Sequence, residues 1–210
     1  RWNLEIARAL QNLRSAGCRL VWTLHNLVPH GARGQEAAAA ARLYREFARQ
    51  ADGAIHHTAW GQQLANRAFA FRPGCRQAVI PFGYFPDEAP PALTKAAARQ
   101  ALEIAESEML LLTVGAAGPR KNLDLIAEAI GSVPDVPCRL VMAGTIDDRL
   151  AQDLARRAGG RIRFVGRLDQ AGLSRLARAA DYLVFAPPAD QLTSGGPHVS
   201  ESFGLPQITT

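Results

Sequence analysis

Lysine is almost absent from this chain of 210 residues, and Lys95 and Lys121 are the only two. No apolar run approaches the ~18 residues of a membrane-spanning helix, which excludes such a segment from this sequence. Cysteine is also scarce: there are three, an odd number, and none forms a C-x-x-C pair. This pattern argues against a disulfide framework and a zinc site, and it favours a reducing cytoplasm.

The remaining positive charge is arginine, and the formal net charge is +5. A basic balance can indicate nucleic acid, an anionic membrane surface or phosphorylated substrates as partners. The arginines are spread along an alanine-rich chain and form no basic block, so we do not expect a nucleic-acid partner. Hydrophobic residues make up 48% of the chain and recur in blocks, which is typical of a folded protein.

Short continuous apolar runs alternate with amphipathic stretches along the whole chain. Continuous runs are typical of strands buried on both faces, and this alternation predicts an α/β fold with parallel sheets covered by helices. We expect strands at residues 19–24, 53–57, 78–81, 109–114, 139–143, 161–165 and 182–186. We expect helices at residues 4–15, 35–50, 61–71, 95–105, 122–132, 149–157 and 171–179.

Residues 81–91 are rich in proline and turn-forming residues and separate two such βα series. We interpret them as a linker, with one domain at 1–88 and another at 89–210. The chain opens with Arg1 and not with methionine, and its first element is a helix with no strand before it. We therefore expect both domains to be incomplete and the chain to be a fragment.

The most informative stretch is residues 110–126, where an apolar strand ends at Gly115. A turn follows, and Lys121 then precedes a helix for which Asn122 is a favourable N-cap residue. Backbone N–H groups, a helix N-terminus and a lysine at the carboxyl end of a parallel strand favour an anion, above all a phosphate. An ordinary turn with a surface lysine is the alternative. The stretch is neither a Walker motif nor a dinucleotide fingerprint.

A second stretch of this kind follows the expected strand at 182–186. Ser194, Gly195 and Gly196 precede Pro197, which suits the first turn of a short helix, and Gly204 suits its end. Two anion-binding turns on neighbouring strands could hold a diphosphate. Taken alone, the Ser-Gly-Gly sequence could be a flexible loop.

Histidines lie near the ends of two strands expected in the first domain. His25 and His30 follow the strand at 19–24, which suits a site, although a structural role is the alternative. His56 and His57 are neighbours in a strand, so at most one can point into a given pocket. The pair Asp147-Asp148 has no third ligand nearby, and we interpret it as a helix start.

Taken in order, four stretches resemble the GT-B glycosyltransferases, most like the bacterial family-4 enzymes. The segment 22–30 (W-T-L-H-N-L-V-P-H) resembles T-x-H-N-x-x-P-H, and 51–58 (A-D-G-A-I-H-H-T) resembles A-D-x-I-x-x-H-S. The segment 114–122 (V-G-A-A-G-P-R-K-N) resembles G-x-I-R-x-Y-K-N. The segment 194–206 (S-G-G-P-H-V-S-E-S-F-G-L-P) resembles S-G-x-x-x-x-A-L-S-F-G-x-P.

The sequence departs from these patterns at several positions. Gly118 stands where the pattern usually has an arginine that helps to hold phosphate, and Phe82 replaces the expected histidine of a P-H-G turn. The E-x7-E motif of many relatives falls on Gln191 and Val199, although Glu201 could be its first glutamate if ten residues were inserted. These departures leave open a degenerate module that binds a nucleotide sugar without turnover.

The resemblance implies two Rossmann-like domains, an acceptor-side one at 1–88 and a nucleotide-sugar one at 89–210. It implies transfer of a sugar from a nucleoside-diphosphate sugar to a saccharide or lipid-linked acceptor, in surface polysaccharide or glycolipid synthesis. We expect no cofactor and no metal, and a location in the cytoplasm or at the inner face of the membrane, with possible peripheral membrane contact. His30 and His25 are the catalytic candidates, and the donor-binding candidates are Gly115, Arg120, Lys121, Asn122, Leu168, Ser194, Gly195 and Gly196.

Overall fold

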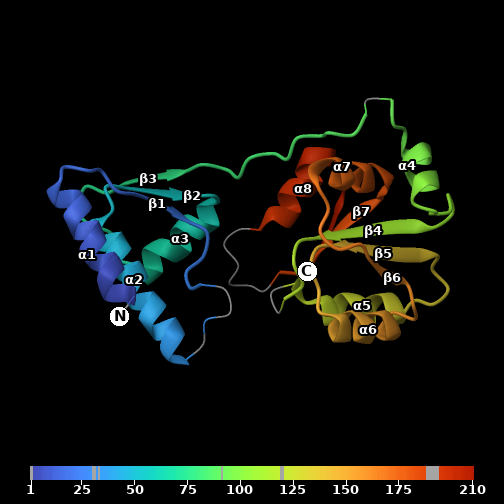
Figure 1. Cartoon of the computed structure of the whole chain (residues 1–210), viewed down its shortest axis with the longest axis horizontal. Coiled ribbons are helices and arrows are strands. Elements are labelled where there is room, and N and C mark those ends of the chain that lie inside the picture. Colours follow the sequence, from blue (N-terminus) through green and yellow to red (C-terminus); the bar gives the residue numbers. More distant parts are fainter. Residues whose placement is uncertain (1, 30–31, 33, 91, 119–120, 188–193) are drawn as a thin grey trace. The chain divides into compact units, whose positions relative to one another are not determined.

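The computed structural model describes the chain except for residues 1, 30, 31, 33, 91, 119, 120 and 188–193 (Figure 1). The chain divides into two compact units, of which the first ends at residue 82 and the second comprises residues 83–190 and 194–210. The sequence placed this boundary six residues later, at 88. Within the described residues, no helix is both long and apolar enough to cross a membrane.

The first unit is a parallel sheet of three described strands, connected by helices. Its strand order is β1-β2-β3, and Thr23, Ile55 and Ala78 lie opposite one another across it. Its elements are α1 (Trp2–Ser15), β1 (Val21–Leu24), α2 (Gly34–Gln50), β2 (Gly53–His56), α3 (Ala59–Ala68) and β3 (Arg76–Val79). The sequence placed the third strand two residues later, because it assigned to the strand the extended segment that leads to Pro81.

The core of the first unit lies between its sheet and helices α2 and α3. Leu24 and Ala54 on the strands pack with Ala48 of α2 and Ala65 of α3. Aromatic side chains extend this core, and the ring of Trp22 stacks on that of Phe47 at a centroid distance of 5.5 Å. The apolar strand positions therefore serve as buried surface, as the sequence pattern predicted.

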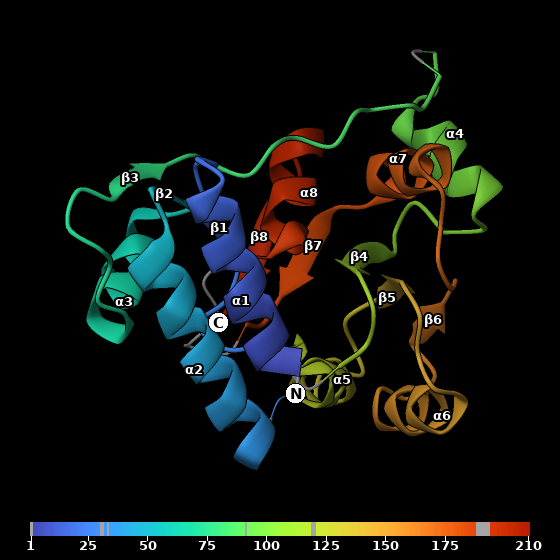
Figure 2. The same cartoon turned by 60° about the vertical axis from the view of Figure 1, so that its left-hand side comes forward.

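The second unit is a five-stranded parallel sheet with helices on both faces (Figure 2). Its strand order is β6-β5-β4-β7-β8. Its elements are α4 (Lys95–Ala101), β4 (Met109–Val114), α5 (Leu123–Gly131), β5 (Cys138–Ala143), α6 (Asp148–Arg157), β6 (Ile162–Phe164), α7 (Gln170–Ala179), β7 (Tyr182–Phe185), α8 (Gly195–Phe203) and β8 (Gln207–Thr209). Asp147 caps α6, as expected, by accepting hydrogen bonds from the backbone N–H groups of Arg149 and Leu150.

Alternate side chains of β4 divide the core of the second unit into two layers. Leu111 packs with α5 and α6 on one face, whereas Leu110 and Leu112 pack with α4 and α7 on the other. The chain winds from β4 through β5 to β6 and then returns to place β7 on the other side of β4. The order of the strands therefore reverses between β4 and β7, which is where doubly wound sheets open a crevice for ligands.

The segment after residue 82 belongs to the second unit because hydrogen bonds fasten it there. The backbone N–H of Phe85 donates to Ser202 Oγ at 2.8 Å, and that of Glu88 donates to Ser174 Oγ at 2.9 Å. Asp87 forms an ion pair with Arg178. The proline-rich composition suggested a linker over residues 81–91, whereas these contacts make residues 85–88 part of the second unit's surface.

Candidate functional site

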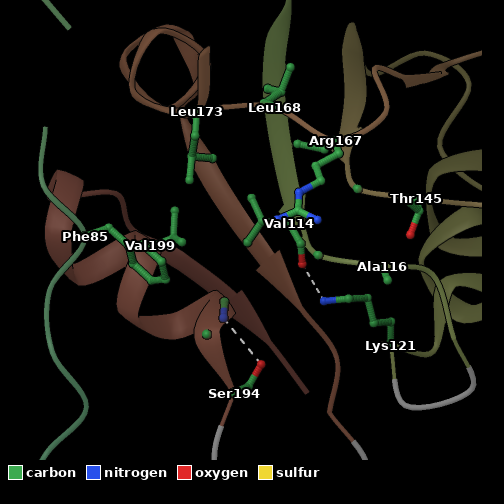
Figure 3. Close-up of a pocket in the computed structure, with 15 residues that line it drawn as sticks. Phe85, Val114, Ala116, Lys121, Thr145, Arg167, Leu168, Leu173, Ser194 and Val199 are labelled. Atoms are coloured by element: carbon green, nitrogen blue, oxygen red, sulfur yellow. Dashed lines mark hydrogen bonds between the residues drawn. The ribbon is translucent and has the colours of Figure 1, made fainter. Parts of the chain in front are cut away.

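A pocket of about 400 Å³ opens at the carboxyl ends of β4 and its neighbouring strands in the second unit (Figure 3). The loops after β4, β5 and β6 and the start of α8 form its walls. The lining residues are Phe85, Val114, Gly115, Ala116, Lys121, Ala143, Gly144, Thr145, Arg167, Leu168, Leu173, Ser194, Gly195, Gly196 and Val199. The two turns that the sequence singled out therefore line one pocket, at the point where the strand order reverses.

Lys121 reaches into this pocket from the loop after β4. Its ammonium group Nζ donates a hydrogen bond to the carbonyl oxygen of Val114, the last residue of the strand. Burial lowers the pKa of this ammonium below its ordinary value. Gly115 leaves room for the side chain, because a Cβ there would lie 3.1 Å from Nζ, and its φ of +97° also favours glycine.

Asn122 is the N-cap residue of α5, as expected, but its side chain makes no capping hydrogen bond. Its backbone is left-handed, with φ 45° and ψ 43°, and this geometry turns the amide away from the helix. The amide Nδ2 donates instead to the carbonyl oxygen of Ala186, just after β7, at 2.9 Å. Asn122 is not among the residues that line the pocket; it connects the two strand ends that border it.

Ser194, Gly195 and Gly196 form the opposite wall at the start of α8. Ser194 is the N-cap residue, and its Oγ accepts a hydrogen bond from the backbone N–H of Gly196 at 3.3 Å. Gly204 ends the helix in a left-handed conformation with φ 64°, as the sequence predicted. The positive end of the helix macrodipole therefore faces the pocket, where it favours a negative charge.

The loop after β5 allows the pocket walls to approach closely. Gly144 has no room for a side chain, since a Cβ there would lie 2.1 Å from the carbonyl oxygen of Gly115. Its backbone N–H donates to the carbonyl oxygen of Gly166 at 2.7 Å. Gly144 thus joins the ends of β4 and β6, and the chain that follows Gly166 brings Arg167 and Leu168 to the pocket.

The charge of the described lining is of one sign. Among the lining residues that the structure describes, the ionisable side chains are Lys121 and Arg167, and there is no aspartate or glutamate. Two cations, the positive end of a helix and small residues at the strand ends suit a ligand that carries negative charge. The site can therefore hold a phosphate or diphosphate next to an apolar group packed on Leu168, Leu173 and Val199.

His25, His56 and His57 lie in the first unit. His56 is buried, and its Nε2 is 2.9 Å from Gln77 Oε1. His57 Nδ1 lies 3.0 Å from the carbonyl oxygen of Ile80, and its ring is 4.9 Å from that of His25. Partial burial, and secondarily the neighbouring His57, lower the pKa of His25. His25 is thus paired with His57 at the ends of β1 and β2, while His56 belongs to the core.

Other sequence candidates have different outcomes. His30 and Arg120 lie outside the described residues, as does Gln191 of the E-x7-E alignment. Val199, the second position of that alignment, is buried and apolar. Glu201 is directed to His198, with 3.0 Å between Oε2 and Nδ1. Among the residues that the structure places, no three His, Cys, Asp or Glu side chains are grouped as metal ligands.

Arg167 and Phe85 are two of the lining residues that were not among the sequence candidates. Arg167 is the neighbour of Leu168, and only Leu168 was chosen as a donor-binding candidate. The apolar side chain of Phe85, in the proposed linker, gave no signal of a site. The order of the strands could have indicated Arg167, because β6 ends at the same edge of the sheet as β4.

The fold and pocket define a doubly wound α/β protein with a cation-lined pocket at the reversal of its strand order. The chain belongs to the family of glycosyl transferases group 1, whose sequence pattern matches residues 94–208. No curated protein sequence matches the chain.

Solved structures of similar fold include several glycosyltransferases. Sucrose-phosphate synthase from Thermosynechococcus elongatus is 21% identical with a TM-score of 0.77, over 97% of this chain and 53% of that one. WaaG, a glycosyltransferase involved in lipopolysaccharide biosynthesis, is 22% identical with a TM-score of 0.73, over 96% and 62%. HepE from Anabaena, solved with UDP and glucose, is 16% identical with a TM-score of 0.74, over 96% and 55%.

These similarities confirm the expected fold class, two Rossmann-like units of the GT-B type with parallel sheets. The chain spans between 53% and 62% of the length of these three structures. At such identities the similarity concerns the fold, and the roles of individual residues depend on the geometry described above.

Proposed function

We propose that this chain carries the donor site of a glycosyltransferase, which moves a sugar from a nucleoside-diphosphate sugar to an acceptor. The observation that carries the proposal is the convergence of the loops after β4 and β7 on one pocket with two cations and no carboxylate among its described lining residues. Membership of the glycosyl transferases group 1 family supports the reaction type. The HepE structures with UDP and glucose and with UDP-glucose support this class of donor.

In this proposal the diphosphate lies between Lys121 and the start of α8. Negative charge grows on the leaving diphosphate as the glycosidic bond breaks, so groups that hold this charge lower the barrier. Lys121 would exchange the Val114 carbonyl for a phosphate oxygen. Ser194, Gly195 and Gly196 would add the positive end of the helix, and the nucleotide base would lie near Leu168. No cofactor or metal forms part of the proposal.

The acceptor hydroxyl requires a group that orients it or takes its proton. We propose His25 or His30 for this role. The pKa of His25 is lowered by partial burial and by His57, so its ring is neutral at pH 7 and able to accept a proton. His25→Ala is expected to reduce transfer while leaving donor affinity unchanged. Equal loss of donor affinity would contradict a role toward the acceptor.

The direct test is nucleotide binding by the chain, measured by calorimetry with a panel of nucleoside diphosphates and their sugars. Lys121→Ala is expected to lower the affinity for the preferred nucleoside diphosphate about tenfold or more. Arg149→Ala is the matched control, since it removes an exposed cation that does not line the pocket. Unchanged affinity in the Lys121 variant would refute the diphosphate assignment. Donor binding without transfer by the complete protein would favour the alternative of a binding module.

We also propose a saccharide or lipid-linked acceptor, in surface polysaccharide or glycolipid synthesis at the cytoplasmic face of a membrane. The charge distribution supports contact with an anionic surface. Residues 1–82 contain 11 arginines and four acidic residues, a net charge of +7. Sedimentation with vesicles of phosphatidylglycerol, and its loss at high salt, tests this contact. Equal sedimentation with neutral phosphatidylcholine vesicles would contradict an electrostatic attachment.

A further inference from the structure

The pocket differs in charge from the unit that contains it. Residues 83–210 carry 13 basic and 15 acidic side chains, a net charge of −2. The described pocket lining nevertheless contains two cations, Lys121 and Arg167, and no carboxylate. Positive charge is therefore concentrated at this site against the balance of its surroundings, which is typical of a site built for an anion.

The backbone on both sides of Arg167 is held in place. Gly166, with φ +68°, accepts a hydrogen bond from the N–H of Gly144 at 2.7 Å. Leu168 packs against the core layer that contains Leu110 and Leu112. These anchors hold the Cα of Arg167 at the carboxyl end of β6, beside the pocket.

The Arg167 side chain extends from this position into the pocket. Figure 3 shows its guanidinium group directed toward Val114, with the Lys121 ammonium approaching the same strand end from the other side. The nearest acidic residue in sequence, Asp169, is engaged elsewhere, because its carboxylate accepts a hydrogen bond from the N–H of Gly172 at 2.7 Å and caps α7.

Several other arginines of the second unit form ion pairs with acidic partners. Arg99 is paired with Asp181, Arg139 with Glu108 and Arg178 with Asp87. Arg167 has no ion pair with any residue that the structure describes, as is true of four other arginines of this unit, but it alone of these five lines the pocket. Its charge is thus available to a ligand, and a planar guanidinium suits two oxygens of one phosphate.

We propose that Arg167 is a phosphate-binding residue, which together with Lys121 holds the diphosphate of the donor from two sides. This inference rests on the proposed function, and it assigns to the loop after β6 a phosphate contact in place of a contact with the base alone. The chemical class that the pair recognises is a diphosphate, free or as part of a nucleotide.

The test compares ligands that differ in the number of phosphates. Calorimetric affinities are measured for the preferred nucleoside, its monophosphate and diphosphate, and inorganic pyrophosphate, with the wild-type chain and with Arg167→Ala, Arg167→Lys and Arg149→Ala. Arg167→Ala is expected to lower the affinity for the nucleoside diphosphate and for pyrophosphate about tenfold and to leave the affinity for the nucleoside unchanged. Arg167→Lys recovers part of the loss, and Arg149→Ala binds like the wild type. Circular dichroism and the Tm confirm that each variant is folded.

Two results would overturn the assignment. Equal loss for the nucleoside and the diphosphate would place Arg167 at the base, and no loss for any ligand would exclude it from the site. The pyrophosphate measurement separates this inference from the proposed function. If pyrophosphate binding depends on Arg167 but no nucleotide binds, the phosphate contact is upheld and the proposed nucleotide-sugar donor is refuted. If a nucleotide binds equally well to the wild type and to Arg167→Ala, the proposed donor is upheld and the phosphate contact of Arg167 is refuted.

Discussion

The amide Nδ2 of Asn122 donates a hydrogen bond of 2.9 Å to the carbonyl oxygen of Ala186. This contact joins the loop after β4 to the end of β7, the two strands between which the order of the sheet reverses. Lys121 is the adjacent residue, so the bond also fixes where the ammonium enters the pocket. One side chain thereby connects the two strand ends from which the turns of the proposed donor site begin.

Removal of this bond is expected to weaken ligand binding more than it weakens the fold. Asn122→Gly keeps a residue that adopts the left-handed backbone freely and deletes only the amide, so stability should fall by about 1 kcal/mol. Asn122→Ala adds backbone strain of about 1 kcal/mol or more. Urea unfolding and calorimetry with a nucleoside diphosphate measure the two effects. If both variants bound like the wild type, the bond would have no role in positioning Lys121.

Diphosphate affinity is expected to depend on pH through Lys121. Burial lowers the pKa of its ammonium, so the group loses its proton at a lower pH than an ordinary lysine. Only the charged form attracts phosphate; affinity is therefore full below the lowered pKa and falls as pH rises through it. Binding should also take up protons in that range, which calorimetry in buffers of different ionisation enthalpy detects. A pH profile identical to that of Lys121→Ala would contradict the prediction.

Sequence patterns predicted the strands of the second unit well because burial on both faces imposes a continuous apolar run. The strand expected at 109–114 has the observed bounds, and that expected at 139–143 differs by one residue. The rule that parallel strands end at one edge then brought Gly115, Lys121 and Gly196 together. These inferences needed only local composition and the order of elements along the chain.

Properties that depend on long-range contacts could not be predicted in this way. Asn122 is a favourable N-cap residue by type, but its amide donates a hydrogen bond to the carbonyl oxygen of Ala186, which is 64 residues away along the chain. Phe85 lies in a proline-rich segment whose attachment to α8 through Ser202 has no local signal. Arg167 is one arginine among 22, distinguished only by the end of β6 from which it extends.

Gly144 is expected to be essential to the pocket for steric reasons. A Cβ at this position would lie 2.1 Å from the carbonyl oxygen of Gly115. Both groups belong to the backbone, so relieving the clash would require the strand ends to move apart. Gly144→Ala should therefore lower the free energy of unfolding by more than ~2 kcal/mol and displace the end of β4. Gly118→Ala is the control, because a Cβ there meets nothing within 4 Å. Similar urea midpoints for the two variants would show that the strand ends are less closely packed than described.

Asp181 attaches α4 to the sheet, and its ionisation should make the stability of the second unit depend on pH. Burial alone would raise the pKa of Asp181, but hydrogen bonds from Lys95, from the N–H of Leu110 and from Arg99 outweigh it and lower the pKa. A carboxyl whose pKa is lowered by folding contributes its stability above the unfolded pKa of about 3.9, and loses it as pH falls through the folded value.

Asp181→Asn is therefore expected to reduce stability at pH 7 by about 1–3 kcal/mol, since it leaves the nearly buried Arg99 without its carboxylate. The difference from the wild type should shrink as pH falls below about 4, the unfolded pKa, and disappear below the lowered pKa of the folded state, where the wild-type carboxyl is also neutral. Urea unfolding from pH 3 to pH 7 follows this change. Lys95→Ala serves as a milder comparison, because Lys95 is half exposed and its ion pair is screened by solvent. A stability difference that stayed constant over the whole pH range would show that the asparagine acts through packing and not through charge.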